Sequence, residues 1–146
     1  MKKAITLLFL STLAAPGLAD ECALVIEGND AMQYNIKEMS VPATCKEVTV
    51  TLNHTGKLPA AAMGHNWVLA STADYQTVAT AGMSAGAENG YLPKDDPRVL
   101  AHTKLIGGGE SSSVTFKTDG LAGKDLTFFC SFPGHFAMMK GSFKVN

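Results

Sequence analysis

The chain has 146 residues, of which 46% are hydrophobic and 17% are charged, and its formal net charge at pH 7 is −1. This length suits one ordinary folded domain, and the charge balance lacks the basic excess with which nucleic-acid-binding proteins hold phosphates. After the first 19 residues, no stretch approaches the roughly 20 apolar residues that a membrane-spanning helix needs.

The N-terminus has the pattern of a secretory signal peptide. Lys2 and Lys3 precede an apolar run that extends to Ala15, and small residues follow it up to Ala19. We therefore predict a signal peptide at residues 1–19, cleaved after Ala19, and one domain at residues 20–146. Cleavage removes two of the twelve basic residues and no acidic one, which leaves ten against thirteen and a net charge of −3.

The three cysteines, an odd number for an exported chain, predict one disulfide and one free thiol. Cys22 and Cys45 lie early in the chain, whereas Cys130 lies far downstream beside histidine and methionine. Because an oxidising compartment favours disulfides, we expect Cys22 to pair with Cys45. Cys130 then remains a free thiol, for which we expect an occupant.

Alternating apolar and polar residues predict a series of short strands separated by turn residues such as Gly28-Asn29-Asp30. Such a series is typical of an all-β sandwich. The predicted strands contain residues 24–26, 48–52, 99–105, 114–116, 126–129 and 143–145.

Residues 72–87 depart from this pattern and predict one inserted helix, capped by Ser71 or Thr72. The apolar residues at helical spacing are Tyr75, Val78, Ala79 and Met83.

A metal-binding pattern follows the predicted strand at 126–129. Cys130, His135 and Met139 have the spacing C-x4-H-x3-M, and Pro133-Gly134 forces a turn between them. A loop between two strands can aim these three side chains at one point. The segment MGHNW offers His65 as a fourth group, next to Trp67, a predicted core residue.

These residue types favour copper. Two imidazoles, one thiolate and a weak thioether contact form the ligand set of blue-copper electron-transfer sites. A structural zinc site more often uses four cysteine or histidine ligands, and a catalytic one keeps a position open for water. A methionine ligand argues against both.

Each residue also has a simpler interpretation. Cys130 can be an inert buried thiol, His65 a core histidine, and Met139 a space-filling side chain. The metal site is preferred because it explains all of them together. A nucleophilic pair of Cys130 and His135 has no visible orienting group.

The two remaining histidines lie outside this pattern. We expect His102 to be a solvent-facing strand residue and His54 a turn or core-edge residue. A pH-linked role for His54 stays open because histidine titrates near neutrality.

The chain resembles the azurin family, small periplasmic blue-copper proteins of the cupredoxin class. The resemblance covers the whole mature chain and is carried by the segments EC, GND, LPAAAMGHNWVL, DDPRVLAHTKLIG, SVTF and FFCSFPGHFAMMKG. It implies a Greek-key β-sandwich of about eight strands, with residues 75–83 in an inserted helical flap, and it also implies the Cys22–Cys45 disulfide.

The resemblance further implies the roles of individual residues. His65, Cys130 and His135 would be equatorial copper ligands, with Met139 as the long axial contact and the Gly64 carbonyl on the opposite side. Two further residues would support the thiolate, Asn66 by bracing the Cys130 loop and Phe132 by donating its backbone N–H to the sulfur.

An apolar docking surface around His135 is also implied. Phe136 and Met138 depart from the commoner family pattern, which affects the shape of this surface. By position, the surface would contain Met32, Leu58, Met63, Met83, Phe132, Gly134, Ala137 and Met138.

The predicted function is one-electron transfer in the periplasm, with one copper cycling between Cu(I) and Cu(II). The expected partners are a c-type cytochrome donor and a reductase or oxidase acceptor, which dock transiently on a monomer. Nucleic acid and membrane insertion are not expected. A copper carrier or chaperone is the alternative. An enzyme such as a copper nitrite reductase or oxidase is less favoured, since a second copper or an open substrate position is not evident.

Overall fold

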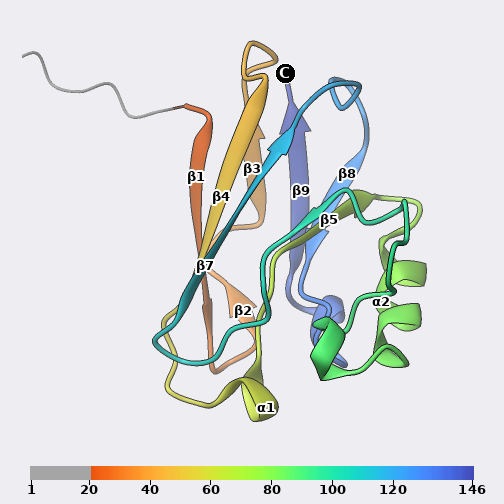
Figure 1. Cartoon of the computed structure of the whole chain (residues 1–146). Helices are drawn as coiled ribbons and strands as arrows, with labels where there is room; N and C mark the ends of the chain where they lie inside the picture. Colours follow the sequence, from red (N-terminus) through yellow and green to blue (C-terminus); the bar gives the residue numbers. More distant parts are fainter. Residues whose placement is uncertain (1–20) are drawn as a thin grey trace, which may run out of the picture.

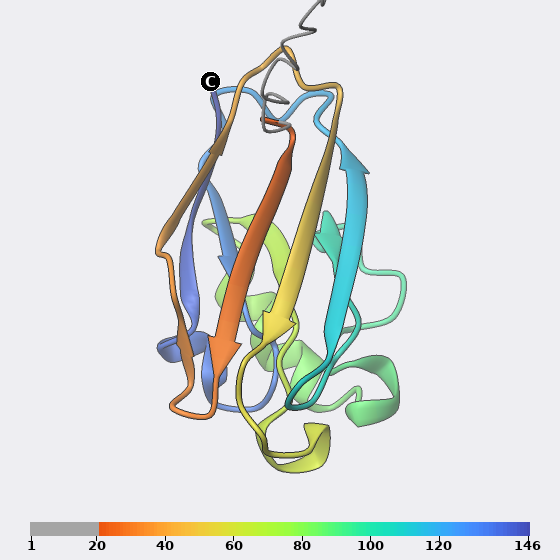
Figure 2. The same cartoon turned by 90° about the vertical axis from the view of Figure 1, so that its left-hand side faces the viewer.

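The computed structural model describes residues 21–146, so the predicted signal peptide and its cleavage site lie outside the described residues. Two β-sheets pack face to face in a sandwich (Figures 1 and 2). Within residues 21–146 there are nine strands, four in one sheet and five in the other. The predicted all-β cupredoxin-like sandwich is confirmed, with two-residue strands raising the strand number.

The four-stranded sheet has the order β2-β1-β4-β7. Strand β1 pairs parallel with β4, and β4 pairs antiparallel with β7. One face carries the fully buried side chains Ile26, Val50 and Leu52, and the other carries paired threonine and serine hydroxyls. These strands span Ala23–Asn29 (β1), Gln33–Tyr34 (β2), Glu47–His54 (β4) and Ser111–Lys117 (β7).

The five-stranded sheet has the order β3-β9-β8-β5-β6. Within the part of this sheet that the structure describes, the β3–β9 pair is parallel and the other pairs are antiparallel. All four residues of β8 are buried, because helix α2, Tyr75–Met83, covers the outer face beside it (Figure 1). The strands span Glu38–Val41 (β3), Val68–Ser71 (β5), Ala101–His102 (β6), Leu126–Phe129 (β8) and Lys140–Val145 (β9).

Trp67 lies at the centre of the core between the sheets, as the sequence predicts, and has no exposed surface. Its ring contacts those of Phe116, Phe128 and Phe143 at centroid distances of 5.9, 6.2 and 5.9 Å. Aromatic pairs at such distances contribute about 0.5–1.5 kcal/mol each beyond the burial of their area. The residue two positions after His65 is therefore held rigidly.

The inserted helix is shorter than predicted. It spans Tyr75–Met83, and a separate 3-10 turn, η1, follows at Ala87–Asn89. The predicted cap is also wrong, since Asp74 occupies the N-cap position and Ser71 accepts the Asp74 backbone N–H at 3.1 Å. The other two helical segments within residues 21–146 are short and span Ala60–Met63 (α1) and His135–Ala137 (η2).

Three strands were not predicted, and one prediction was too long. Strand β2 has only two residues, too few to show an alternation, whereas β3 does alternate (EMSV) and was overlooked. The apolar residues of β5 are buried on both faces and do not alternate. Residues 99–105 keep an alternating burial, with Ala101 and Thr103 buried and His102 exposed, but only two residues pair in the sheet.

The cysteine prediction is confirmed. Cys22 and Cys45 form a disulfide with Cα atoms 5.6 Å apart, and Cys130 is a buried free thiol. A loop closed over 23 residues contributes on the order of 3 kcal/mol by the chain-entropy model. This disulfide ties β1 to the segment before β4. No helix in residues 21–146 has the length and hydrophobicity to cross a membrane.

Candidate metal centre

Three potential metal ligands converge at the end of the sandwich opposite the C-terminus (Figure 1). Cys130 directly follows β8, His135 begins η2, and His65 lies between α1 and β5. Their ligating atoms all lie within 4.8 Å of one another, and each side chain is at most 3% exposed. The fold thus joins a distant histidine to the loop that carries the other two groups.

The spacing of these atoms fits a metal ion in near-trigonal coordination. Cys130 Sγ lies 3.9 Å from Nδ1 of His65 and 3.7 Å from Nδ1 of His135. Bonds of about 2.3 Å to sulfur and about 2.0 Å to nitrogen, at an angle of about 120°, place the two atoms about 3.7 Å apart. The distances between the sulfur and the two nitrogens therefore fit those expected around a bound copper ion.

His65 presents the correct nitrogen to this site. Its Nε2 donates a hydrogen bond to the Asn29 carbonyl at 2.8 Å, which leaves the lone pair on Nδ1 directed toward Cys130. The His65 backbone exchanges two hydrogen bonds with Ile106, at 3.0 and 2.8 Å. Both the tautomer and the position of the ring are therefore set by residues distant in sequence.

The β8–β9 loop positions Cys130, His135 and Met139 through its own backbone. Cys130 N donates to Met139 O at 3.0 Å, Met139 N to His135 O at 2.7 Å, and His135 N to Phe132 O at 2.9 Å. Gly134 has φ of 83°, a conformation that favours glycine, and it allows the chain to turn before His135. The C-x4-H-x3-M spacing thus forms a closed, hydrogen-bonded turn.

Met139 and Gly64 also lie at this site. Met139 is fully buried, and its Cε lies 3.3 Å from the point where a Gly28 side chain would begin, with the His65 ring 2.8 Å from the same point. The Gly64 carbonyl oxygen lies 3.8 Å from Cys130 Sγ. A side chain at Gly64 would meet Ala60 O at 2.5 Å, so only glycine fits there.

Burial raises the pKa of the Cys130 thiol to about 12, although backbone N–H groups of Asn66 and Phe132 donate to the sulfur and lower it. The thiol is therefore neutral without a cation, and metal binding must displace its proton. Burial lowers the pKa of His135 to about 4, and that of His65 falls for the same reason. Both imidazoles are neutral and ready to bind a metal at pH 7.

Asn66 links the two segments that form the site. Its side chain accepts the Ser131 backbone N–H at 2.9 Å and donates to Ser131 Oγ at 2.7 Å and to Gly90 O at 3.0 Å. The Tyr34 hydroxyl donates to the Asn66 carbonyl. Sequence reasoning missed Tyr34 and Ser131, since a hydroxyl gives no sign of its distant partner.

His54 is more closely connected to the site than the sequence indicated. It is only 2% exposed, and its ring stacks on that of His65 at a centroid distance of 4.3 Å. Nε2 donates to Met63 O at 2.8 Å, and Nδ1 accepts the Gly56 N–H at 3.1 Å. Its alternation with Val50 and Leu52 was a signal that it belongs to the inner face.

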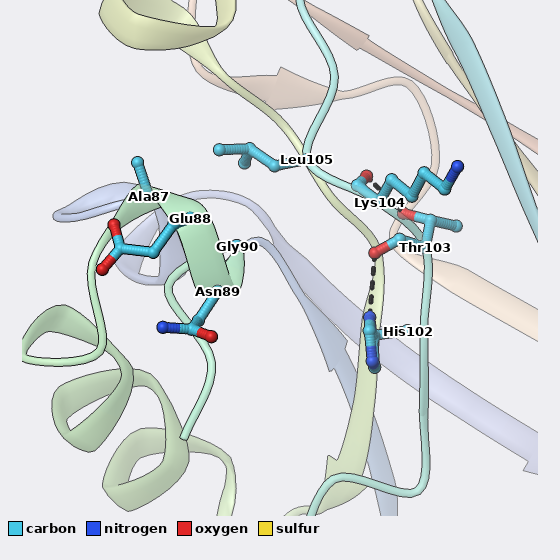
Figure 3. Close-up of a pocket in the computed structure, with 8 residues that line it drawn as sticks. All are labelled: Ala87, Glu88, Asn89, Gly90, His102, Thr103, Lys104 and Leu105. Carbon is cyan, nitrogen blue, oxygen red and sulfur yellow. Dashed lines mark hydrogen bonds between the residues drawn. The ribbon is translucent and has the colours of Figure 1, made fainter. Parts of the chain in front are cut away.

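His102 is exposed and lies apart from the ligand cluster, in agreement with the prediction. It borders a pocket of about 400 Å³ between η1 and residues 102–105, where its Nδ1 donates to the Thr103 carbonyl (Figure 3). Gly90, on the rim of this pocket, also accepts hydrogen bonds from Asn66 and Ser131. The pocket therefore borders the hydrogen bonds by which Asn66 and Ser131 connect the two segments of the metal centre.

The side chains expected on the docking surface are accessible to different degrees. Met32, Leu58, Met83 and Met138 are 40%, 42%, 42% and 59% exposed, whereas Met63 and Phe132 are half-buried. Gly134 and Ala137 are exposed beside His135. By contrast, Phe136 is half-buried and packs against the apolar cluster under α2, so it supports the loop from behind.

A two-sheet sandwich that holds a buried cysteine between two imidazoles defines a copper protein of the cupredoxin type. Residues 20–146 match the family model of copper-binding proteins described as the plastocyanin/azurin family. The chain belongs to this family.

Known azurins are similar to this chain over most or all of its length. The chain is 54% identical to azurin from Achromobacter denitrificans over 100% of this chain and 99% of the relative, and 52% identical to azurin from Pseudomonas aeruginosa over the same shares. A solved azurin from the methylotroph Methylomonas sp. strain J superposes with a TM-score of 0.82 at 47% identity, covering 86% of this chain and 98% of that one. Copper is the cofactor, and blue-copper electron transfer is the function.

Proposed function

We propose that His65 Nδ1, Cys130 Sγ and His135 Nδ1 hold the copper equatorially, with the Met139 thioether as a long axial contact and the Gly64 carbonyl opposite. The observation that carries this assignment is the pair of sulfur–nitrogen distances, 3.9 and 3.7 Å, inside a buried pocket. Copper supplies the one-electron chemistry, and soft sulfur with borderline nitrogen suits both Cu(I) and Cu(II).

The surrounding chain would keep the ligands still during each electron transfer. His65 is held by Asn29 and Ile106, and the loop with Cys130 and His135 is closed by backbone hydrogen bonds. A cage that changes little between oxidation states lowers the reorganisation that each transfer requires. This rigidity supports an electron carrier rather than an enzyme.

Metal delivery is less well supported. A carrier that hands over its metal needs ligands that a partner can reach, whereas His65 and Cys130 have no exposed surface and His135 retains 3%. Release of the metal would also require the bonds between Cys130, Met139 and His135 to open.

Electrons would enter and leave at His135, through a docking surface formed by Met32, Leu58, Met63, Met83, Phe132, Gly134, Ala137 and Met138. An apolar surface with several methionines suits weak, adaptable contacts. The proposed partners are a c-type cytochrome donor and a reductase or oxidase acceptor. Met138 is more exposed than Met32, Leu58 and Met83 and would affect the fit to each partner most directly among these four.

We further propose that residues 1–19 direct export to the periplasm, and that residues 20–146 work there as a monomeric domain. The disulfide between Cys22 and Cys45 supports an oxidising compartment.

Copper titration followed by reduction tests the assignment. The mature chain, expressed without residues 1–19, receives one equivalent of Cu(II) and then ascorbate while its visible absorption is recorded. We expect an intense blue band that bleaches on reduction and returns on reoxidation. A pale complex, or oxidation of Cys130 without stable colour, would show that these ligands do not form one rigid site and would favour metal delivery.

A further inference from the structure

The residues on either side of Met139 are each anchored by a lysine side chain. Lys37 Nζ donates to the Met138 carbonyl at 2.8 Å, across 101 positions of sequence. Lys140 Nζ donates to the Tyr75 hydroxyl at 2.8 Å and lies 5.2 Å from the centre of the Tyr75 ring. Met139, the proposed axial contact, therefore lies between two residues that are each held by a hydrogen bond from a lysine side chain.

The Lys37 anchor is reinforced by the backbone. The Lys37 carbonyl accepts the Ser142 N–H at 2.9 Å, so the segment before β3 is attached to β9 by both main chain and side chain. Gly141 packs so closely here that an added Cβ would lie 2.3 Å from Lys37 O. This contact holds Met138 and the start of β9 at a set distance from β3.

The Lys140 anchor reaches the opposite side of the loop. Tyr75 begins α2 and is 9% exposed, and its ring contacts that of Phe129 at a centroid distance of 5.8 Å. Phe129 pairs with Lys140 in the sheet and directly precedes Cys130. A hydrogen bond to Tyr75 therefore attaches Lys140 to a residue that also packs against Phe129 at the end of β8.

Among the described residues, neither lysine has a carboxylate partner that would offset a charge on it. Within residues 21–146 the ion pairs are Arg98–Asp96 and Lys144–Glu38, and neither includes Lys37 or Lys140. Each instead donates to a neutral oxygen. A positive charge close to the site favours Cu(I) over Cu(II), because the reduced ion carries one charge less.

We propose that Lys37 and Lys140 are paired positioning residues for the copper centre, which hold the Met138–Lys140 segment between β3 and α2 and raise the reduction potential. The proposal rests on the axial role of Met139 proposed above. It assigns a role to the β2–β3 connection and to Tyr75, which lie outside the β8–β9 loop. Charge and position contribute separately and can be separated by mutation.

Reduction potentials of the copper-loaded variants test the charges. In K37M and K140M we expect the Cu(I)/Cu(II) ratio at a given applied potential to fall about twofold each, a size typical of partly screened surface charges. K37R keeps the charge and the donor and should retain the original ratio. K124M is the matched control, since exposed Lys124 is next to Gly123, which binds Val145 at the other end of β9.

Amide hydrogen exchange of the copper-free protein tests positioning without the metal. The Met139 and Cys130 N–H groups, which donate to His135 and Met139, should exchange about three- to tenfold faster in K37M, in K140M and in Y75F, which keeps both charges. K124M should leave them unchanged.

Two outcomes would overturn the proposal: exchange rates in K37M, K140M and Y75F that equal those of K124M, or potentials of K37M and K140M that match the K124M potential. Failure of the axial assignment is distinguishable, because it would appear as an unchanged potential in M139L while the exchange experiment still reports on the two anchors.

Discussion

The two segments that meet at the copper centre are held in different ways. The β8–β9 loop, which carries Cys130 and His135, is closed by hydrogen bonds within its own backbone. The Gly64–Asn66 segment has no such closure, and it is attached to distant residues, among them Ile106 and Ser131. One segment therefore acquires its shape locally, and the other acquires it from the sandwich.

This difference indicates what each segment contributes. The loop determines how Cys130, His135 and the proposed donor Met139 lie relative to one another, because only a few residues separate them. The Gly64–Asn66 segment determines where the loop lies relative to the core, through Asn66 and through Trp67 in the centre of the sandwich. Changes in the loop should alter the copper chemistry, and changes at Asn66 should alter stability first.

The largest effect is expected from C130S, which removes the only thiolate from the loop. The intense copper–thiolate absorption should disappear completely, because a serine hydroxyl does not replace the soft sulfur donor. The visible spectrum of the Cu(II)-loaded variant measures this, and far-UV circular dichroism controls for folding. Survival of the intense blue colour would refute the assignment of Cys130.

N66A cuts the connection between the two segments. It leaves the buried Ser131 N–H and hydroxyl without their Asn66 partner, which should destabilise the copper-free protein by about 2–3 kcal/mol. Chemical denaturation measures the loss, and a double-mutant cycle with S131A should give a coupling of about 1 kcal/mol. Additive effects of the two variants would show that the bond between the Asn66 side chain and the Ser131 hydroxyl does not couple the segments.

M139L tests the loop without removing an equatorial donor. The blue colour should remain while the reduction potential rises, because the weak thioether donor that favours Cu(II) is lost. A rise of roughly tenfold in the Cu(I)/Cu(II) ratio corresponds to about 59 mV for a one-electron couple. Voltammetry measures it, and an unchanged potential would mean that Met139 is not axial.

The most gradual effect is expected from pH, because it accumulates over more than two pH units. Because burial lowers the pKa of His135 from 6.5 to about 4, the unfolded chain binds a proton at this residue between these values and the folded copper-free protein does not. Its contribution to stability is complete above about pH 6.5 and is lost as the pH falls toward 4. The slope from this group cannot exceed about 1.4 kcal/mol per pH unit.

Denaturation of the copper-free protein at several pH values measures this slope, and H135N is the control. The variant should have a flatter dependence between pH 6.5 and 4, since its residue 135 does not titrate. Parallel curves for the two proteins would contradict the lowered pKa of His135.

The sequence alone was sufficient for the class of fold, the disulfide and the kind of metal site. Alternation in strands such as β1, β4 and β9 follows from the two-residue period of a half-buried strand. Cys130, His135 and Met139 were identified together because covalent spacing brings them into one turn. The sequence did not reveal β5, whose burial on both faces removes the alternation, or the early end of α2.

Only the tertiary structure decided how the distant groups meet. The tautomer of His65, the stacking of His54 on its ring, and the contact of Tyr34 with Asn66 all depend on the register of strands far apart in sequence. The anchors at Lys37 and Lys140 have the same origin. Residue types and local spacing determine which chemistry a loop can perform, whereas nonlocal packing determines the orientation and the electrostatic surroundings of each ligand.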